Sequence, residues 1–208
     1  SDNPDYCSLY ATTGLFNNIL PVIADNLTGR YAKKLLLTCK YPDNELPLRL
    51  AAILFVCSPD EARTALRNLR MDNKTIDTVV KILTYTPLHI DETEPAVREA
   101  LHQCGRDIFM LVIRLQRASI KASEEITFIS NPAKYNHLNK LQRMADDILE
   151  RGDCFTIKAL DISGNDLIEY GLKGAEIGNT LNTLLDIVIE NPKLNDKATL
   201  IALLDNLK

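Results

Sequence analysis

The fold class is decided by the stretch Ala175-Glu176-Ile177-Gly178-Asn179-Thr180-Leu181-Asn182-Thr183-Leu184-Leu185-Asp186-Ile187-Val188-Ile189-Glu190. Its apolar residues return every three or four positions, at Ile177, Leu181, Leu184, Leu185 and Val188. This spacing places them along one side of an α-helix and leaves polar side chains on the other side. The stretch therefore predicts an amphipathic helix that packs against other helices.

The same periodicity covers most of the chain, and the alternating runs typical of strands are scarce. Of the 208 residues, 46% are hydrophobic but only 6% are aromatic and none is Trp, so the core must consist of Leu, Ile, Val and Ala. We predict an all-α protein: an elongated, multi-helix right-angled array with a smaller C-terminal helical tail domain. The expected helices cover residues 30–40, 46–57, 58–70, 72–84, 95–119, 133–151, 165–170, 175–190 and 196–207, with a short extended piece at 155–162.

Helix start signals and one polar segment set the expected boundaries. Ser58, Pro59 and Glu61 have the pattern of a capped helix start, and Asp72 is expected to cap the next helix. Residues 121–132 are polar and mixed and end in Asn131-Pro132. They predict a linker between a helical neck and body region at residues 1–120, with a degenerate His-Asp-domain character, and a helical tail domain at residues 133–208.

Composition also bounds the location and the partners. The net charge of −4 argues against a protein that binds nucleic acid through overall positive charge, although local phosphate contacts remain compatible with it. Five widely spaced cysteines without a C-x-x-C pair favour buried thiols in a reducing compartment. No apolar run approaches the length of a membrane span. We expect a cytoplasmic protein that does not contact a membrane.

Catalytic patterns are missing from the sequence. His89, His102 and His137 stand far apart in the chain and belong to no nucleophile or metal-binding motif. Each is expected to be a surface or packing residue. We expect no catalytic residue, no metal ligand and no cofactor in this chain.

Two groups of basic residues have helical spacing. Either group is explained by a solvated helix face or by contact with phosphates. The first group is Arg63, Arg67, Arg70 and Lys74, and the second is Arg106, Arg114, Arg117 and Lys121.

The segment Gly171-Leu172-Lys173-Gly174 comes directly before the helix at 175–190. Glycines at a helix start let an anion approach the free backbone N–H groups, and Lys173 adds a mobile cation. A simple turn before a helix explains the same residues. The pattern leaves both interpretations open.

The region from residue 160 to residue 204 resembles the tail of bacterial CCA-adding tRNA nucleotidyltransferases and related poly(A) polymerases (class II). The resemblance rests on the stretches 160–168, 171–178 and 191–195 together with the apolar positions between them. The family usually has Gly-Pro where this chain has Gly174-Ala175. Upstream, Leu48–Leu54 is similar to a body helix that in many relatives runs into a His-Asp metal motif, where this chain has Phe55 and Val56.

The resemblance implies that the chain is the body and tail of such an enzyme without its catalytic head. In the family, the head holds two carboxylates in a D-x-D arrangement for Mg²⁺ and uses CTP or ATP, and a neck motif selects the nucleotide. We find neither pattern, and we expect this chain to be inactive alone and to depend on the N-terminal head of the full-length protein.

The expected partner is tRNA, contacted at the acceptor stem and elbow through shape and backbone, and not DNA. The residues expected to bind RNA are Lys173, Gly174, Asn179, Arg114, Arg117 and Lys121; the family motif supports only the first three. Two alternatives are a degenerate His-Asp-domain phosphohydrolase relative and a helical module that binds a protein partner.

Overall fold

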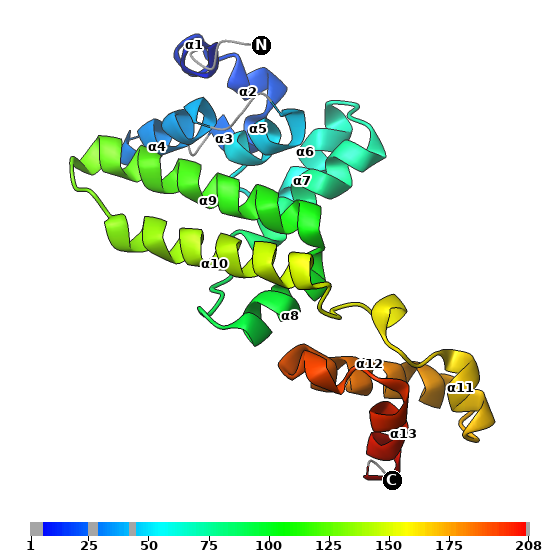
Figure 1. Cartoon of the computed structure of the whole chain (residues 1–208). Coiled ribbons are helices and arrows are strands. Elements are labelled where there is room, and N and C mark those ends of the chain that lie inside the picture. The colour runs from blue at the N-terminus through cyan, green and yellow to red at the C-terminus, as the bar shows by residue number, and fades with distance from the viewer. Residues whose placement is uncertain (1–5, 25–28, 42–44, 207–208) are drawn as a thin grey trace. The chain divides into compact units, whose positions relative to one another are not determined.

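A computed structural model describes residues 6–24, 29–41 and 45–206, and in these ranges it contains helices and no β-strand (Figure 1). The all-α prediction is confirmed. None of these helices has both the length and the apolar character needed to cross a membrane. The helices are α1 (Tyr6–Thr12), α2 (Phe16–Ile19), α3 (Pro21–Ala24), α4 (Gly29–Lys40), α5 (Leu46–Ile53), α6 (Pro59–Asn68), α7 (Asn73–Tyr85), α8 (Glu94–Cys104), α9 (Arg106–Thr127), α10 (Pro132–Arg151), α11 (Gly164–Glu169), α12 (Ala175–Glu190) and α13 (Lys197–Asn206), with 3-10 turns η1 (Ile157–Ala159) and η2 (Pro192–Leu194).

The predicted helix starts at α6 and α7 are confirmed. The backbone N–H of Glu61 donates to the Ser58 hydroxyl at 3.3 Å, and the Ser58 N–H donates to the Glu61 carboxylate at 2.8 Å. The Asp72 carboxylate accepts a hydrogen bond from the Thr75 N–H at 2.9 Å. These bonds satisfy backbone donors that have no partner inside the helix, so side chains close in sequence fix where each helix begins.

The chain forms two compact units, and the first contains residues 1–89 and 104–142. Its core is apolar and comes from α2 to α7 and α9; Leu48, Leu66, Ile82 and Leu115 are completely buried. Helix α9 contacts α4, α5 and α7. It also pairs with α10 as an antiparallel hairpin, since Arg117 contacts Asn139 while Glu124, further along α9, contacts the earlier Tyr135 of α10 (Figure 1).

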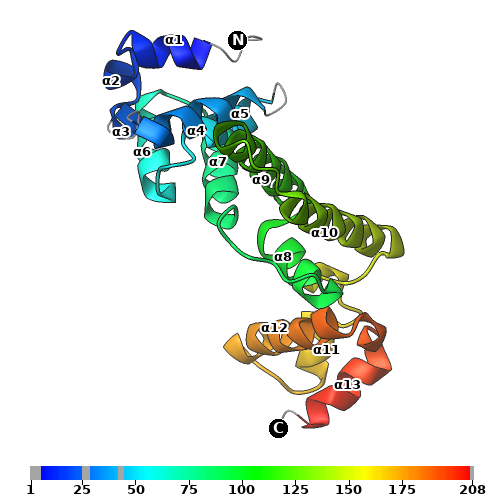
Figure 2. The ribbon, with the colours of Figure 1, turned by 90° about the vertical axis from the view of Figure 1, so that its left-hand side faces the viewer.

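The second unit contains residues 90–103 and 143–208. Its core gathers apolar side chains from α11, α12 and α13, and the predicted apolar side of α12 supplies Leu184, Leu185 and Val188, each at most 1% exposed. Helix α12 contacts both 3-10 turns and α11, and Figure 2 shows α11 beside α12. Residues 155–162, which we expected to be extended, contain the 3-10 turn η1 instead.

The helix predicted at 95–119 is two helices, because Gly105 interrupts it. Gly105 has φ +79° and ψ 158°, a backbone conformation that only glycine adopts without strain. The apolar pattern continues on both sides of Gly105, so periodicity alone did not reveal the break. Helix α8 belongs to the second unit and α9 to the first.

The linker expected at residues 121–132 is mostly helical in the structure and does not separate the two units. Helix α9 continues to Thr127, so only residues 128–131 connect it to α10. The division into units falls within α10, after Gln142, and not at residues 121–132. The reason is that residues 90–103 pack with the C-terminal part of the chain, where Arg98 of α8 bonds to residues 153, 189 and 190.

Candidate nucleic-acid interface

A basic side of α9 lines a pocket in the first unit. Arg114, Arg117 and Lys121 lie at i, i+3 and i+7 and therefore share one side of the helix. All three line a pocket of about 210 Å³, together with Tyr41, which directly follows α4, and Tyr135 from α10. The structure thus brings together three of the six residues predicted to bind RNA.

A second, larger pocket of about 720 Å³ shares Arg114 with the first and is also lined by Lys74 and Arg106. The two pockets together have five basic lining residues, Lys74, Arg106, Arg114, Arg117 and Lys121, against two acidic ones, Glu45 and Asp107. This hollowed surface is therefore locally basic in a chain whose net charge is −4. We call these five basic residues the α9 basic groove.

The cations of the smaller pocket differ in how their charge is compensated. Arg114 forms an ion pair with Glu45 at 2.7 Å. Arg117 donates at 2.8 Å to the side-chain oxygen of Asn139, which is neutral. The Lys121 ammonium lies 4.5 Å from the centre of the Tyr41 ring and is exposed to solvent. Arg117 and Lys121 thus keep positive charge that an anion can neutralise, whereas Arg114 has a carboxylate beside it.

The first basic group does not lie along one helix as its spacing suggested. Helix α6 ends at Asn68, and Arg70 has a left-handed φ of 55° before α7 begins. Arg63 is paired with Asp77 at 2.8 Å. Of this group, Lys74 alone lines the α9 basic groove.

The start of α12 in the second unit holds the other three predicted residues. Gly174 has φ 57° and ψ −129°, and a Cβ there would meet nothing within 4 Å, so the backbone is open to solvent at this point. Lys173 and Asn179 are exposed. The Glu176 carboxylate accepts a hydrogen bond from the Lys173 N–H at 3.4 Å, so a negative charge already lies beside this positive end of the helix.

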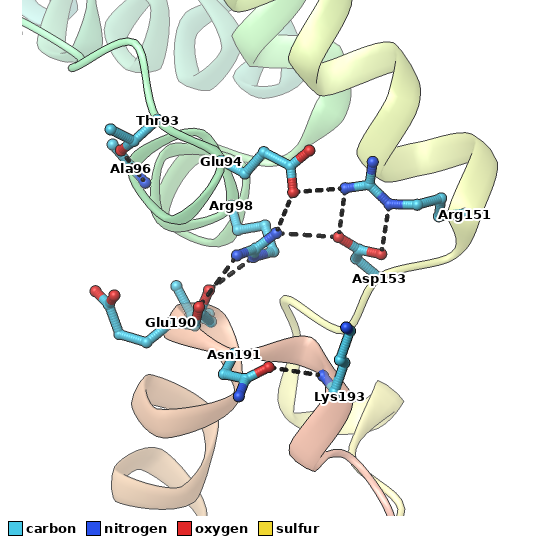
Figure 3. Close-up of polar contacts among 10 residues, drawn as sticks. Thr93, Glu94, Ala96, Arg98, Arg151, Asp153, Glu190, Asn191 and Lys193 are labelled. Atoms are coloured by element: carbon cyan, nitrogen blue, oxygen red, sulfur yellow. Dashed lines mark hydrogen bonds and ion pairs between the residues drawn. The ribbon is translucent and has the colours of Figure 1, made fainter.

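The other end of α12 is held by Arg98, a residue of α8 whose side chain is only 2% exposed (Figure 3). Its guanidinium donates to the carbonyl oxygens of Ile189 at 2.6 Å and Glu190 at 3.3 Å. It also contacts Glu94 at 3.2 Å and Asp153 at 3.1 Å. The last carbonyls of a helix lack partners within it, so Arg98 caps α12 and joins it to α8.

Arg151 completes this charge cluster. It lies 2.9 Å from both Glu94 and Asp153, and hydrogen bonds from Arg151 and then from Arg98 hold the pKa of the Asp153 carboxyl below its ordinary value. Two guanidinium groups thus face two carboxylates in the second unit (Figure 3). The cluster is balanced in charge, so it stabilises the unit and is not a phosphate site.

Histidines and cysteines offer no metal site within the described parts of the chain, where no group of three potential ligands converges. His89 and His137, which are far apart in sequence, stack with ring centres 5.4 Å apart, and His102 contacts the Phe155 carbonyl at 3.0 Å. Phe55 and Val56, at the place of the relatives' His-Asp motif, pack against the apolar core of the first unit.

Among the described residues, four cysteines are buried, as expected of structural thiols: Cys39, Cys57, Cys104 and Cys154. Burial raises the pKa of the Cys57 thiol to about 11, helped by the charge of Glu61. Burial likewise raises the pKa of Cys104 to about 11. Neither thiol is a nucleophile at neutral pH.

The described part of the chain is thus a helical protein that has one locally basic surface, the α9 basic groove. A protein-family model described as tRNA nucleotidyltransferase domain 2 matches residues 47–204, and the chain therefore belongs to this tRNA nucleotidyltransferase family. The match begins at the second residue of α5, covers α6 to α12 completely and covers most of α13. No curated protein and no solved structure matches the chain.

Three residues next to these sites escaped the sequence analysis. Tyr41 and Tyr135 line the smaller pocket, but they are distant in sequence and follow no motif. Arg98 was not singled out from the sequence as a functional residue. Its placement after the apolar Val97, in a helix with Glu94 one turn earlier, was the available signal that its side chain could be buried and paired.

Proposed function

We propose that this chain is the tRNA-binding helical region of a tRNA nucleotidyltransferase, CCA-adding or related, and that it takes part in tRNA 3′-end processing. The family supplies the tRNA-related context. The observation that favours binding through this part of the chain is the α9 basic groove, five cations around two pockets that share Arg114. Lysine and arginine side chains arranged in this way neutralise RNA phosphates and release their counterions.

The start of α12 is proposed as a second contact, through Lys173, the open backbone at Gly174, and Asn179. We rank it below the α9 basic groove because Glu176 already compensates the positive end of the helix. The chemistry of nucleotide addition, with Mg²⁺ and CTP or ATP, is proposed to belong to the head of the full-length protein. The body and tail then hold the tRNA while the head acts.

The test is binding of the chain to deacylated tRNA over a salt series, with a DNA hairpin as control. We expect tRNA to bind more tightly than the hairpin and with a steep salt dependence. The double variant Arg117→Glu/Lys121→Glu removes two phosphate ligands, so the slope of log affinity against log salt is expected to shrink by about 2.

The matched control is Arg67→Glu/Lys158→Glu. It reverses one exposed arginine and one exposed lysine outside the groove, so its net charge changes by the same amount. It is expected to bind tRNA as the unchanged chain does. Equal losses in both variants would mean that overall charge, and not the groove, controls binding. No binding at any salt, or binding that salt does not weaken, would refute the proposal and favour a protein-interaction module.

A further inference from the structure

The smaller pocket has features that a phosphate contact does not require. Buried Leu48 and Ala118 are among its lining residues, beside the rings of Tyr41 and Tyr135. Its volume of about 210 Å³ is below the roughly 300–1,000 Å³ of pockets for drug-sized ligands. A space of this size, with apolar and aromatic side chains in its lining beside the three basic ones, fits one planar ring.

Both tyrosines are held in place through their hydroxyl groups. The Tyr135 hydroxyl donates to Glu124 at 3.2 Å, and the Tyr41 hydroxyl donates to Glu125. Burial, together with the charge of Glu124, raises the pKa of Tyr135, so its ring stays neutral. A neutral ring that is fixed before binding loses little freedom when a flat ligand stacks on it.

The cations at the pocket point to a ligand that joins a flat ring to an anion. Arg117 has one neutral partner, Asn139, and a guanidinium has five donor hydrogens, so it can also bind a phosphate. Lys121 adds a flexible ammonium. Glu124 and Glu125 accept the hydroxyl hydrogen bonds of Tyr135 and Tyr41, and their negative charge disfavours a second phosphate at that end of the pocket. A nucleotide has this composition, since its ribose joins a flat base to a phosphate.

We propose that this pocket binds a single unpaired nucleotide of the RNA, with its base against Tyr135 and its phosphate at Arg117 and at Lys121, whose ammonium lies over the Tyr41 ring. The inference rests on the proposed RNA-binding function and adds a preference for an unpaired position. A base within a duplex is stacked on both faces, so it cannot enter the pocket. Stacking on an aromatic ring is tolerant of sequence, since every base has a flat face.

The experiment compares two variants of Tyr135 in the full chain. Tyr135→Phe keeps the ring, whereas Tyr135→Leu keeps an apolar side chain without it. The probes are a single-stranded RNA tetranucleotide carrying one 2-aminopurine, whose fluorescence reports stacking, a blunt RNA duplex, and cytidine monophosphate. We expect Tyr135→Leu to weaken tetranucleotide binding by about 5- to 150-fold, and Tyr135→Phe, which keeps the ring but loses the bond to Glu124, to weaken it much less. Duplex binding is expected to be equal in all three proteins.

The outcomes separate the two proposals. Unchanged tetranucleotide binding in a folded Tyr135→Leu variant, with tRNA binding still sensitive to Arg117→Glu/Lys121→Glu, overturns the nucleotide pocket and leaves the RNA-binding function standing. If the unchanged chain does not bind tRNA, both the RNA-binding function and the nucleotide pocket are refuted. Cytidine monophosphate that binds as tightly as the tetranucleotide overturns the assignment to RNA, because the ligand is then a free nucleotide. Far-UV circular dichroism establishes that each variant is folded.

Discussion

Replacing Arg98 by Met is expected to destabilise the second unit by about 3 kcal/mol, the low end of the cost of removing one partner of a buried ion pair, because Asp153 keeps its ion pair with Arg151. The side chain is 2% exposed, and its partner Asp153 is 9% exposed, so water cannot replace the lost contact. The carbonyl oxygens of Ile189 and Glu190 also lose their donor, and an unsatisfied buried acceptor costs about 1–3 kcal/mol. Met has a long apolar side chain, so loss of packing adds little.

Arg151→Met is the matched comparison. Arg151 contacts the same Asp153 oxygen at 2.9 Å, against 3.1 Å for Arg98, but its side chain is 44% exposed. Exposed ion pairs contribute at most about 1 kcal/mol, so this variant is expected to lose far less stability than Arg98→Met. The measurement is native-state hydrogen exchange of the backbone amides of α12, which gives the free energy of opening for this unit.

The loss caused by Arg98→Met is also expected to depend on pH. Arg151 first and Arg98 second lower the pKa of Asp153 in the folded chain, so the share of stability that Arg98 contributes is present above the unfolded pKa of about 3.9 and disappears as pH falls through the folded value. The two proteins should therefore differ most at neutral pH and less in acid. A loss below about 1 kcal/mol at neutral pH, or one equal to that of Arg151→Met, would refute the argument that burial makes this arginine important.

Two further predictions concern the backbone and the thiols. Gly105→Ala places a Cβ in a glycine-only conformation where no neighbour lies within 4 Å, so backbone strain alone should lower the free energy of unfolding in urea by about 1–3 kcal/mol. Gly178→Ala, inside α12 and equally open, should raise that free energy by about 0.5–1 kcal/mol. Changes of the same sign in both variants would contradict this account. Cys57, with its pKa raised to about 11, should resist alkylation by iodoacetamide at pH 8 in the native chain and react once the chain is unfolded in urea. Mass spectrometry of the peptide that contains Cys57 measures this labelling. Rapid labelling of the native chain would show that the thiol is not protected.

Local features of the fold were predictable from sequence, and features made by distant residues were not. The capping box at Ser58 and the cap at Asp72 depend on side chains three positions apart, so the sequence contains the whole interaction. The break at Gly105 was missed because helical periodicity persists on both sides of it. A glycine there is compatible with a continuous helix until tertiary packing assigns α8 and α9 to different units.

The candidate site shows the same limit. The helical spacing of Arg114, Arg117 and Lys121 placed them correctly on one side of α9. Tyr41, just after α4, and Tyr135 of α10 reach that pocket from elsewhere in the chain, and no local pattern connects them to it. Whether a cation is free to bind phosphate also depended on its neighbours: Arg114 has Glu45 and Arg117 has Asn139.

The capping of α12 by Arg98 has a consequence for the timing of synthesis. The Arg98 guanidinium and the Ile189 carbonyl are 91 positions apart in the chain. At about 5–20 residues per second, the ribosome needs roughly 5–18 s to make the intervening segment, and during this time Arg98 has none of its α12 partners. The Arg98 guanidinium of α8 therefore stays hydrated while α9 and the first part of α10 complete the first unit. The second unit can close only after nearly the whole chain has emerged, which makes it the last part of the molecule to acquire its native contacts.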